Sequence, residues 1–218
     1  MEYPIAVNYE YTNNLYKAKQ WLNNLPDLFA ADFEVASKFT KKQKEVLKLR
    51  LENCYNNEKQ RILLQQITSD GLSHPSLTVI THLSVGWTDR DSKVIVCDTE
   101  RIRMLVLEFL ITTDKRQLWH NCVFDFKHIF YNTGVLPQNY TDTQLLAKAL
   151  LNDADSFKDR TGLKDLMGYA YGAWGISKDD FTLEEMWTED MLKYAATDSP
   201  ACFSLYQDIQ KSLTQWKI

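Results

Sequence analysis

The spacing of apolar residues divides the chain into amphipathic helices and short strands. Leu15, Ala18 and Leu22 recur at helical spacing, which predicts a first helix over residues 13–25. The apolar stretch LFAADFEVA follows directly and predicts a strand close to the core. The N-terminal part of the chain is therefore expected to pair a surface helix with a buried strand.

A long helix is predicted from Lys41 to about Ile67, with apolar residues on one face and lysines on another. The β-branched stretches LTVITHLSVGW and KVIVCD are then joined by the turn TDRDS, which predicts two further strands. The remaining predicted elements are a helix over 101–113, a strand over 117–121 and helices over 123–132, 143–151, 163–172 and 192–213. Thr141 or Asp142 is expected to cap the helix over 143–151.

This order of elements predicts the fold class. Three consecutive antiparallel strands, followed by strands that alternate with helices, are typical of an α/β domain with a mixed β-sheet flanked by helices. The length of 218 residues suits a single domain over residues 1–218. Within it, we expect a basic helical insertion at about residues 38–70.

Composition narrows the class of protein further. Hydrophobic residues make up 44% of the chain and charged residues 25%, as in a globular protein with a real core. No apolar run approaches the ~20 residues that cross a bilayer, and the N-terminus lacks secretory character. The cysteines are far apart and form no CxxC pair, which favours reduced thiols. We therefore expect a soluble cytoplasmic domain with no membrane partner.

The net charge of −4 hides an uneven distribution. Eight basic and three acidic residues lie between Lys38 and Arg61, a local net charge of +5 that leaves −9 for the rest of the chain. A basic arm on an acidic body suits a polyanionic substrate that approaches metal-loaded carboxylates. A merely solvated helix has the same composition, and composition alone favours that second interpretation.

Asp32 and Glu34 in the first predicted strand are the first candidates for chemistry. Side chains alternate along a strand, so the two carboxylates point to one face and Phe33 points to the other. Two carboxylates in an apolar strand are costly unless they are compensated, and a divalent cation would compensate both. Alone, the D-x-E pattern is more typical of a solvated face.

Acidic groups recur on two later elements. Asp125 lies near the start of a helix among apolar neighbours, where the helix dipole would also favour a surface acid. Tyr194 and Asp198 are four residues apart and share one helical face. Together with the first pair, these groups place acids on three separate elements with apolar flanks. Ligation by oxygen alone favours Mg²⁺ or Mn²⁺ over zinc, and two such ions suit a phosphodiester displacement.

The ordered motifs D-x-E, N-x-x-x-D and Y-x-x-x-D resemble the DEDD superfamily of 3'-5' exonucleases in its tyrosine-bearing branch. The resemblance is strongest to the proofreading exonuclease domain of family A DNA polymerases. It extends over TDTQLLAKALL and TGLKDLMGYAYG, and covers the chain from about residue 13 to 210. The motif residues are Asp32-Phe33-Glu34, Asn121 with Asp125, and Tyr194 with Asp198.

The resemblance implies a ribonuclease H-like fold and hydrolysis with two divalent cations, Mg²⁺ or Mn²⁺. Asp32 would contact both ions, Glu34 and Asp198 would complete the first site, and Asp125 would serve the second. Tyr194 would hydrogen-bond the attacking water, helped by Glu34. The ion lowers the pKa of this water, so no strong general base is needed.

Substrate contacts are implied at Asn121, which would touch the terminal nucleotide, and at Phe33. We add the hypothesis that Lys41, Lys44 and Lys48 of the basic segment grip the nucleic-acid backbone or dock a partner. The expected substrate is a single-stranded or frayed DNA 3' end, from which nucleoside 5'-monophosphates are released. No base-reading motif is present, which agrees with a nuclease that reads no sequence.

No polymerase segment follows the last motif, so we expect a stand-alone nuclease for proofreading or end-trimming. Its expected partner is a separately encoded DNA polymerase, and its expected setting is a bacterial or phage-infected cell. Two alternatives stay open: an RNase D-like enzyme that trims RNA 3' ends, and a catalytically silent accessory module, which the five intact motif groups argue against.

Pro200 is expected to kink the last helix close to Asp198. Asp142 is interpreted as a structural helix-start acid, and His120 and His128 lack zinc-ligand spacing.

Overall fold

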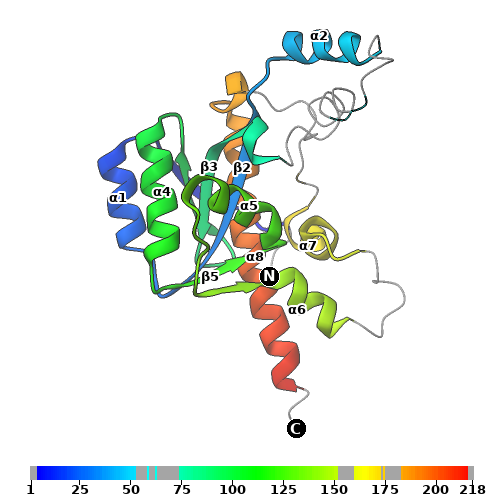
Figure 1. The fold of residues 1–218 in the computed structure, drawn as a ribbon. Coiled ribbons are helices and arrows are strands. Elements are labelled where there is room, and N and C mark those ends of the chain that lie inside the picture. Colours follow the sequence, from blue (N-terminus) through cyan, green and yellow to red (C-terminus); the bar gives the residue numbers. More distant parts are fainter. Residues whose placement is uncertain are drawn as a thin grey trace.

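The computed structural model describes residues 4–52, 58, 62, 74–151, 160–172, 174 and 183–215. Its centre is a six-stranded sheet in the order β1-β4-β3-β2-β5-β6 (Figure 1). The strands are β1 (Asn8–Thr12), β2 (Leu28–Ser37), β3 (Thr78–Gly86), β4 (Asp91–Val96), β5 (Arg116–Trp119) and β6 (Tyr140–Asp142).

The sheet is mixed, as the order of elements predicted. β3 pairs antiparallel with β2 on one side and with β4 on the other, which confirms the unit of three antiparallel strands. β5 and β6 add to β2 in parallel, and β1 adds in parallel to β4. The edge strands β1 and β6 were not predicted, because they are short and mostly exposed and so lack apolar alternation.

Helices cover both faces of the sheet (Figure 1). One face carries α1 (Leu15–Asn23), α4 (Glu100–Thr112) and α5 (Cys122–Thr133), whose apolar side chains share one core with the sheet. The other face is crossed by α8 (Glu189–Gln215), which contacts β2, β3 and β4. The flanking helices α6 (Thr143–Leu150) and α7 (Leu163–Tyr171) lie against α8.

The basic segment after β2 is described in part. Its helix α2 (Lys41–Glu52) lies apart from the sheet and from the helices that cover it (Figure 1). The rest of the helix predicted to about Ile67 is outside the described residues except at positions 58 and 62, which are helical. Short 3-10 turns, η1 (Pro75–Leu77) and η4 (Leu183–Glu185), precede β3 and α8.

Helix α8 continues through Pro200 without interruption, and the kink expected there stays a prediction. Its close approach to β3 depends on Gly86, because a Cβ at that position would lie 2.8 Å from the Pro200 nitrogen. The hydroxyl of Tyr171 lies between two backbone carbonyls and shares its proton between Asp89 at 2.7 Å and Pro200 at 3.1 Å. These contacts hold α8 against the sheet two residues after Asp198.

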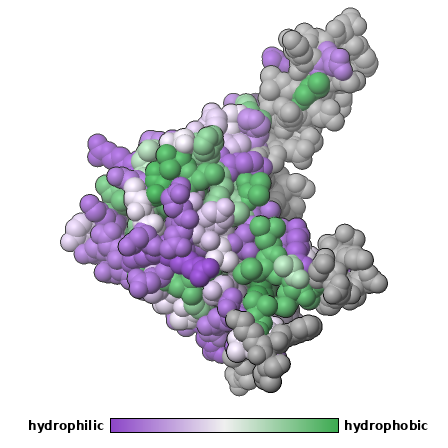
Figure 2. Space-filling view, turned by 60° about the horizontal axis from the view of Figure 1, so that its bottom comes forward, coloured by the Kyte–Doolittle hydropathy of each residue, from purple (hydrophilic) through white to green (hydrophobic). Residues whose placement is uncertain are grey.

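Within the described ranges, the structure has no helix that combines the length and the apolar character needed to cross a membrane. The face drawn in Figure 2 agrees with this, because hydrophobic patches alternate there with hydrophilic residues and form no continuous belt.

Candidate active site

Strand β2 presents Asp32 and Glu34 on one face, as the alternation predicted. Phe33 and Val35 belong to the core under α4 and α5, whereas Ala36 packs in the cluster formed with α8. Glu34 is buried and Asp32 is half-buried. Both carboxylates therefore face α8 in a partly desolvated environment, in which their negative charges need a positive partner.

Asp125 closes the open edge of β2. Strand β5 pairs with β2 only over Leu28–Ala30, so the next part of the β2 edge has no strand beside it. Helix α5 covers this part, and the Asp125 carboxylate accepts a hydrogen bond from the Phe33 N–H at 3.2 Å. The bond anchors Asp125, which is 98% buried, at the residue between Asp32 and Glu34.

Asn121 begins α5 in the left-handed conformation, with a φ of 60°. An asparagine tolerates this conformation better than most residues do. Asp142 stabilises the turn, because its carboxylate accepts hydrogen bonds from the N–H groups of Asn121 at 3.2 Å and Cys122 at 2.9 Å. It also caps α6, which confirms its interpretation as a helix-start acid. The exposed Asn121 side chain is thereby placed at the end of β5, one turn before Asp125.

Helix α8 brings Asp198 to the carboxylates of β2. One carboxylate oxygen from each of Asp32, Glu34 and Asp198 can be chosen so that all three lie within 4.8 Å of one another. Among the described residues this is the one group of acids, histidines or cysteines that could hold a metal ion. Asp125 is outside this 4.8 Å group, although its bond to the Phe33 N–H holds it beside the strand residues Asp32 and Glu34.

Tyr194 lies one turn before Asp198 and is buried. Burial, followed by the negative charges of Glu34, Asp198 and Asp32, raises the pKa of the Tyr194 phenol. The phenol therefore remains protonated and able to donate a hydrogen bond at neutral pH. Such a group can orient a neighbouring water but cannot act as a base.

Lys164 of α7 contacts Tyr194 twice, although the sequence interpretation gave it no role. Its ammonium donates to the Tyr194 oxygen at 2.8 Å and lies 4.2 Å from the centre of the ring. Because the lysine occupies an acceptor position of the phenol oxygen, the phenol proton is directed elsewhere.

Trp174 is the second residue that the sequence interpretation did not place in the site. Its indole N–H donates to Oδ1 of Asp198 at 2.6 Å. Its ring packs edge-on against Tyr171, with centroids 5.7 Å apart. A large aromatic residue carries no signal for such a bond in the sequence, because the partner is 24 residues away.

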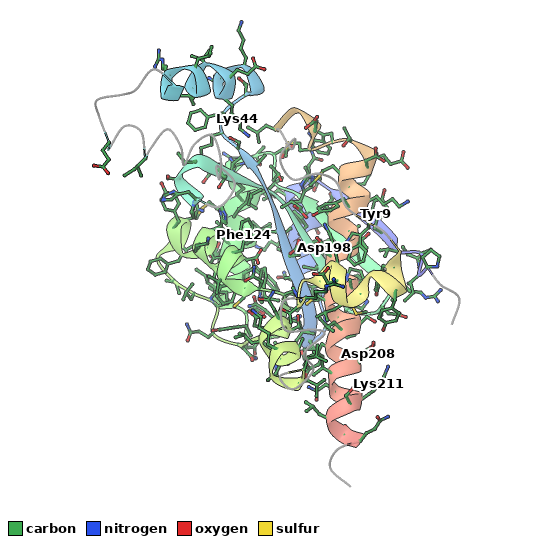
Figure 3. The ribbon with its side chains drawn as sticks, turned by 90° about the vertical axis from the view of Figure 1, so that its right-hand side faces the viewer. Tyr9, Lys44, Phe124, Asp198, Asp208 and Lys211 are labelled. Atoms are coloured by element: carbon green, nitrogen blue, oxygen red, sulfur yellow. The ribbon has the colours of Figure 1, made fainter. Side chains whose placement is uncertain are left out.

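Two groups of predicted substrate contacts are separate from the carboxylates. The Phe33 ring is 97% buried and its centroid lies 5.6 Å from that of Trp119, so the side chain belongs to the core, and the substrate contact expected at Phe33 stays a prediction. Lys44 is half-buried on α2, away from Asp198 (Figure 3). The side chains of Lys41 and Lys48, also on α2, are outside the described part of the structure.

The residues present fit a site for hard divalent cations. Asp32, Glu34 and Asp198 offer oxygen ligands only, at a spacing that one ion can bridge. His120 offers no competing zinc ligand, because its two ring nitrogens hydrogen-bond the Thr143 hydroxyl and the Thr161 carbonyl.

The sequence matches the family model described as 3'-5' exonuclease over residues 12–214. No curated protein matches it. The fold is similar to that of Brucella melitensis NrnC with bound Mg²⁺, with 18% identity, a TM-score of 0.56, and coverage of 97% of this chain and 82% of that one.

Two further solved structures share the fold. Escherichia coli RNase D, an exoribonuclease involved in structured RNA processing, is 15% identical, with a TM-score of 0.57 and coverage of 94% of this chain and 44% of that one. Trypanosoma brucei RNase D in complex with RNA U12 is 16% identical, with a TM-score of 0.60 and coverage of 92% and 62%. These likenesses agree with the expected ribonuclease H-like fold.

Proposed function

The chain belongs to a family of 3'-5' exonucleases, and on that premise we propose that it removes nucleotides singly from the 3' end of single-stranded or frayed DNA. The observation that carries the proposal is the convergence of Asp32, Glu34 and Asp198 within 4.8 Å, with Tyr194 beside them. The product would be a nucleoside 5'-monophosphate. Proofreading beside a separately encoded polymerase, or trimming of DNA ends, would use this activity.

Exonucleases of this kind use two divalent metal ions, and the acidic cluster is compatible with them. When bound, such ions lower the pKa of water and neutralise charge on the scissile phosphate. We assign Asp32, Glu34 and Asp198 to one ion, and Asp32 with Asp125 to the other. Asp125 would contribute a carboxylate oxygen to the ion while it keeps its bond to the Phe33 N–H.

The chain's own residues would orient the attacking water. The protonated Tyr194 phenol can donate to it or to Glu34, while Lys164 holds the phenol oxygen from the other side. Glu34 is buried beside this phenol, so its carboxylate can accept a hydrogen bond from the water. Asn121 is exposed at the start of α5, where its amide can contact the terminal nucleotide.

The basic helix α2 would grip the strand upstream of the site. We expect replacement of Lys41, Lys44 and Lys48 by glutamine to weaken binding of single-stranded DNA and to reduce the slope of log K against log salt by about 2. The control replaces two exposed lysines on other helices, Lys19 on α1 and Lys211 on α8. Equal salt slopes for all of these proteins would remove α2 from the binding surface.

RNA is the second candidate substrate. The structural neighbours include an RNase D bound to RNA U12 and the Brucella NrnC bound to pGG. DNA and RNA offer the same charged phosphodiester, so the carboxylates of the described site do not distinguish deoxyribose from ribose. RNA trimming therefore uses the same residues, and only the preferred strand differs.

The test is a digestion of matched 5'-labelled DNA and RNA strands with Mg²⁺ or Mn²⁺ and identification of the released nucleotide. Asp32→Asn should abolish cleavage, whereas Asp27→Asn, which removes an exposed carboxylate before β2, should not. Faster cleavage of DNA supports the proposal, and faster cleavage of RNA moves the assignment to RNA trimming. Intact DNA and RNA under both ions would favour the silent accessory module.

A further inference from the structure

Lys164 brings a positive charge to the edge of the carboxylate cluster. It is the second residue of α7, which lies against α8 on the face of the sheet that carries the carboxylates. Figure 3 shows α7 in front of α8, at the level of Asp198. The Lys164 ammonium is 2.8 Å from the Tyr194 oxygen, and Tyr194 precedes Asp198 by one helical turn. The lysine is therefore one hydrogen bond away from a residue that adjoins the candidate metal ligands.

The Lys164 ammonium can still bind an anion. None of the described carboxylates forms an ion pair with it, although the charges of the candidate metal ligands reach the Tyr194 phenol. An ammonium group carries three N–H donors, and the Tyr194 oxygen uses one of them. Lys164 is half-buried, so solvent reaches this side of the site. The charge and two donors of the lysine are therefore available to an anion that enters from solvent.

The scissile phosphate is the anion closest to Lys164 in the proposed reaction. This phosphate would lie at the ions held by Asp32, Glu34 and Asp198, and the attacking water would lie beside Tyr194. An ammonium group that is hydrogen-bonded to Tyr194 is then next to the phosphate that the water attacks. Charge-assisted bonds from ammonium to phosphate oxygen are strong, and they strengthen as negative charge grows on the acceptor.

We propose that Lys164 binds a non-bridging oxygen of the scissile phosphate and holds the same phosphate on the released nucleoside 5'-monophosphate. It would thus be a catalytic residue in its own right, in addition to its contact with Tyr194. The diester carries one negative charge and the product phosphate up to about two, so the contact strengthens during cleavage. The inference rests on the proposed nuclease function, since it names the residue that recognises the reacting group.

A lysine that only orients Tyr194 would make the same hydrogen bond to the phenol. The two roles differ in one respect, because orientation requires the Tyr194 oxygen and the phosphate contact does not. Tyr194→Phe removes this oxygen and keeps the ring, whose centre is 4.2 Å from the ammonium. Removal of the Lys164 charge in the presence and in the absence of the phenol therefore isolates the direct contact with phosphate.

Binding of deoxythymidine 5'-monophosphate in Mg²⁺, measured by calorimetry, tests the proposal without turnover. Lys164→Gln should weaken this binding by about tenfold, the effect of losing one charge-assisted hydrogen bond, both alone and in combination with Tyr194→Phe. Deoxythymidine, which lacks the phosphate, should bind equally to all of these proteins. Unchanged affinity for the monophosphate in Lys164→Gln, or a loss that disappears when Tyr194 is phenylalanine, would overturn the proposal.

Lys193→Gln is the matched control, because Lys193 is an exposed lysine of α8 next to Tyr194 in the chain. It should leave the affinity for the monophosphate within about twofold, since a charge further from the phosphate is screened by solvent. An equal loss in Lys193→Gln would show a general charge effect and reject the contact. Lys164→Met, which keeps a long side chain without the charge, serves in place of Lys164→Gln if that variant fails to fold.

Loss of the ions would also weaken product binding, and a Mn²⁺ titration of Lys164→Gln separates this cause. Removal of a positive charge beside a cation site favours the cation, so Mn²⁺ affinity should be equal to or above that of the unmodified protein. Weaker Mn²⁺ binding would assign the effect to the ions and overturn the proposal. Cleavage of a labelled strand tests the proposed function separately: no cleavage rejects that function, whereas cleavage with unchanged product affinity in Lys164→Gln rejects only the phosphate contact.

Discussion

Replacement of Trp174 by phenylalanine removes one hydrogen bond from the candidate metal cluster and little else. The indole N–H donates to Oδ1 of Asp198 at 2.6 Å, while the ring packs edge-on against Tyr171. Phenylalanine preserves an aromatic ring for that packing and lacks the donor. The variant therefore tests whether the indole orients the Asp198 carboxylate toward the position of an ion.

The size of the effect follows from the type of bond. A hydrogen bond to a charged acceptor is worth about 1.5–3 kcal/mol when it is shielded from water. Trp174 is half-buried, so the lower end of this range applies. Loss of a hydrogen bond to a metal-ligating carboxylate typically weakens metal binding by about 10- to 100-fold. We expect Trp174→Phe to weaken Mn²⁺ binding by about tenfold, equivalent to about 1.4 kcal/mol.

Titration of the free protein with Mn²⁺, followed by electron paramagnetic resonance, measures this affinity without any substrate. Exonuclease activity should then show the same shift in the ion concentration for half-maximal rate, with the rate recovered at saturating Mn²⁺. Trp187→Phe is the matched control, because Trp187 is 43% exposed and has no bond to the cluster. Unchanged Mn²⁺ affinity in Trp174→Phe would refute the positioning role of the indole.

Three other predictions follow from the same contacts. Lys164→Gln should lower kcat by about tenfold with little change in KM, measured on a labelled strand, since the Tyr194 phenol loses the partner that holds its oxygen; a pure KM effect would contradict this role. Chelation of divalent ions should abolish cleavage. Addition of Mn²⁺ to the ion-free protein should raise its melting temperature, because the ion binds the folded state. An unchanged melting temperature would argue against a site in the folded chain. Burial lowers the pKa of His120, so as the pH falls the imidazole is protonated in the unfolded chain before it is protonated in the folded one. The free energy of unfolding in urea should therefore fall as the pH drops below about 6.5. His120→Gln should remove part of that fall, and an equal fall in both proteins would contradict this cause.

The faces of β2 could be predicted because side chains alternate along a strand and the residues around Asp32 and Glu34 are apolar. Phe33 and Val35 had to enter a core, and this placed Asp32 and Glu34 together on the opposite face. The arrival of Asp198 at this face was not a consequence of periodicity. It depends on how α8 crosses the sheet, and only the order of the motifs, compared with a known family, indicated it.

Lys164 and Trp174 could not be found in this way. Their partners Tyr194 and Asp198 are 30 and 24 residues away, and the bonds exist only because α7 and Trp174, three residues after its end, return against α8. Neither contact repeats along the chain, and neither is marked by a cap or a turn. The edge strands β1 and β6 escaped prediction for a related reason, since parallel pairing at a sheet edge leaves no alternation in a short exposed stretch.

The shortness of β5 joins the fold to the chemistry. Because β5 pairs with β2 only as far as Ala30, the Phe33 N–H lies at an edge where no strand can accept its hydrogen bond. Asp125 accepts it instead, and the same bond fixes that carboxylate beside Asp32 and Glu34. A longer β5 would satisfy the edge with backbone carbonyls and would leave Asp125 without its anchor. The acids can therefore converge at this point of the sheet because the strand pairing stops there.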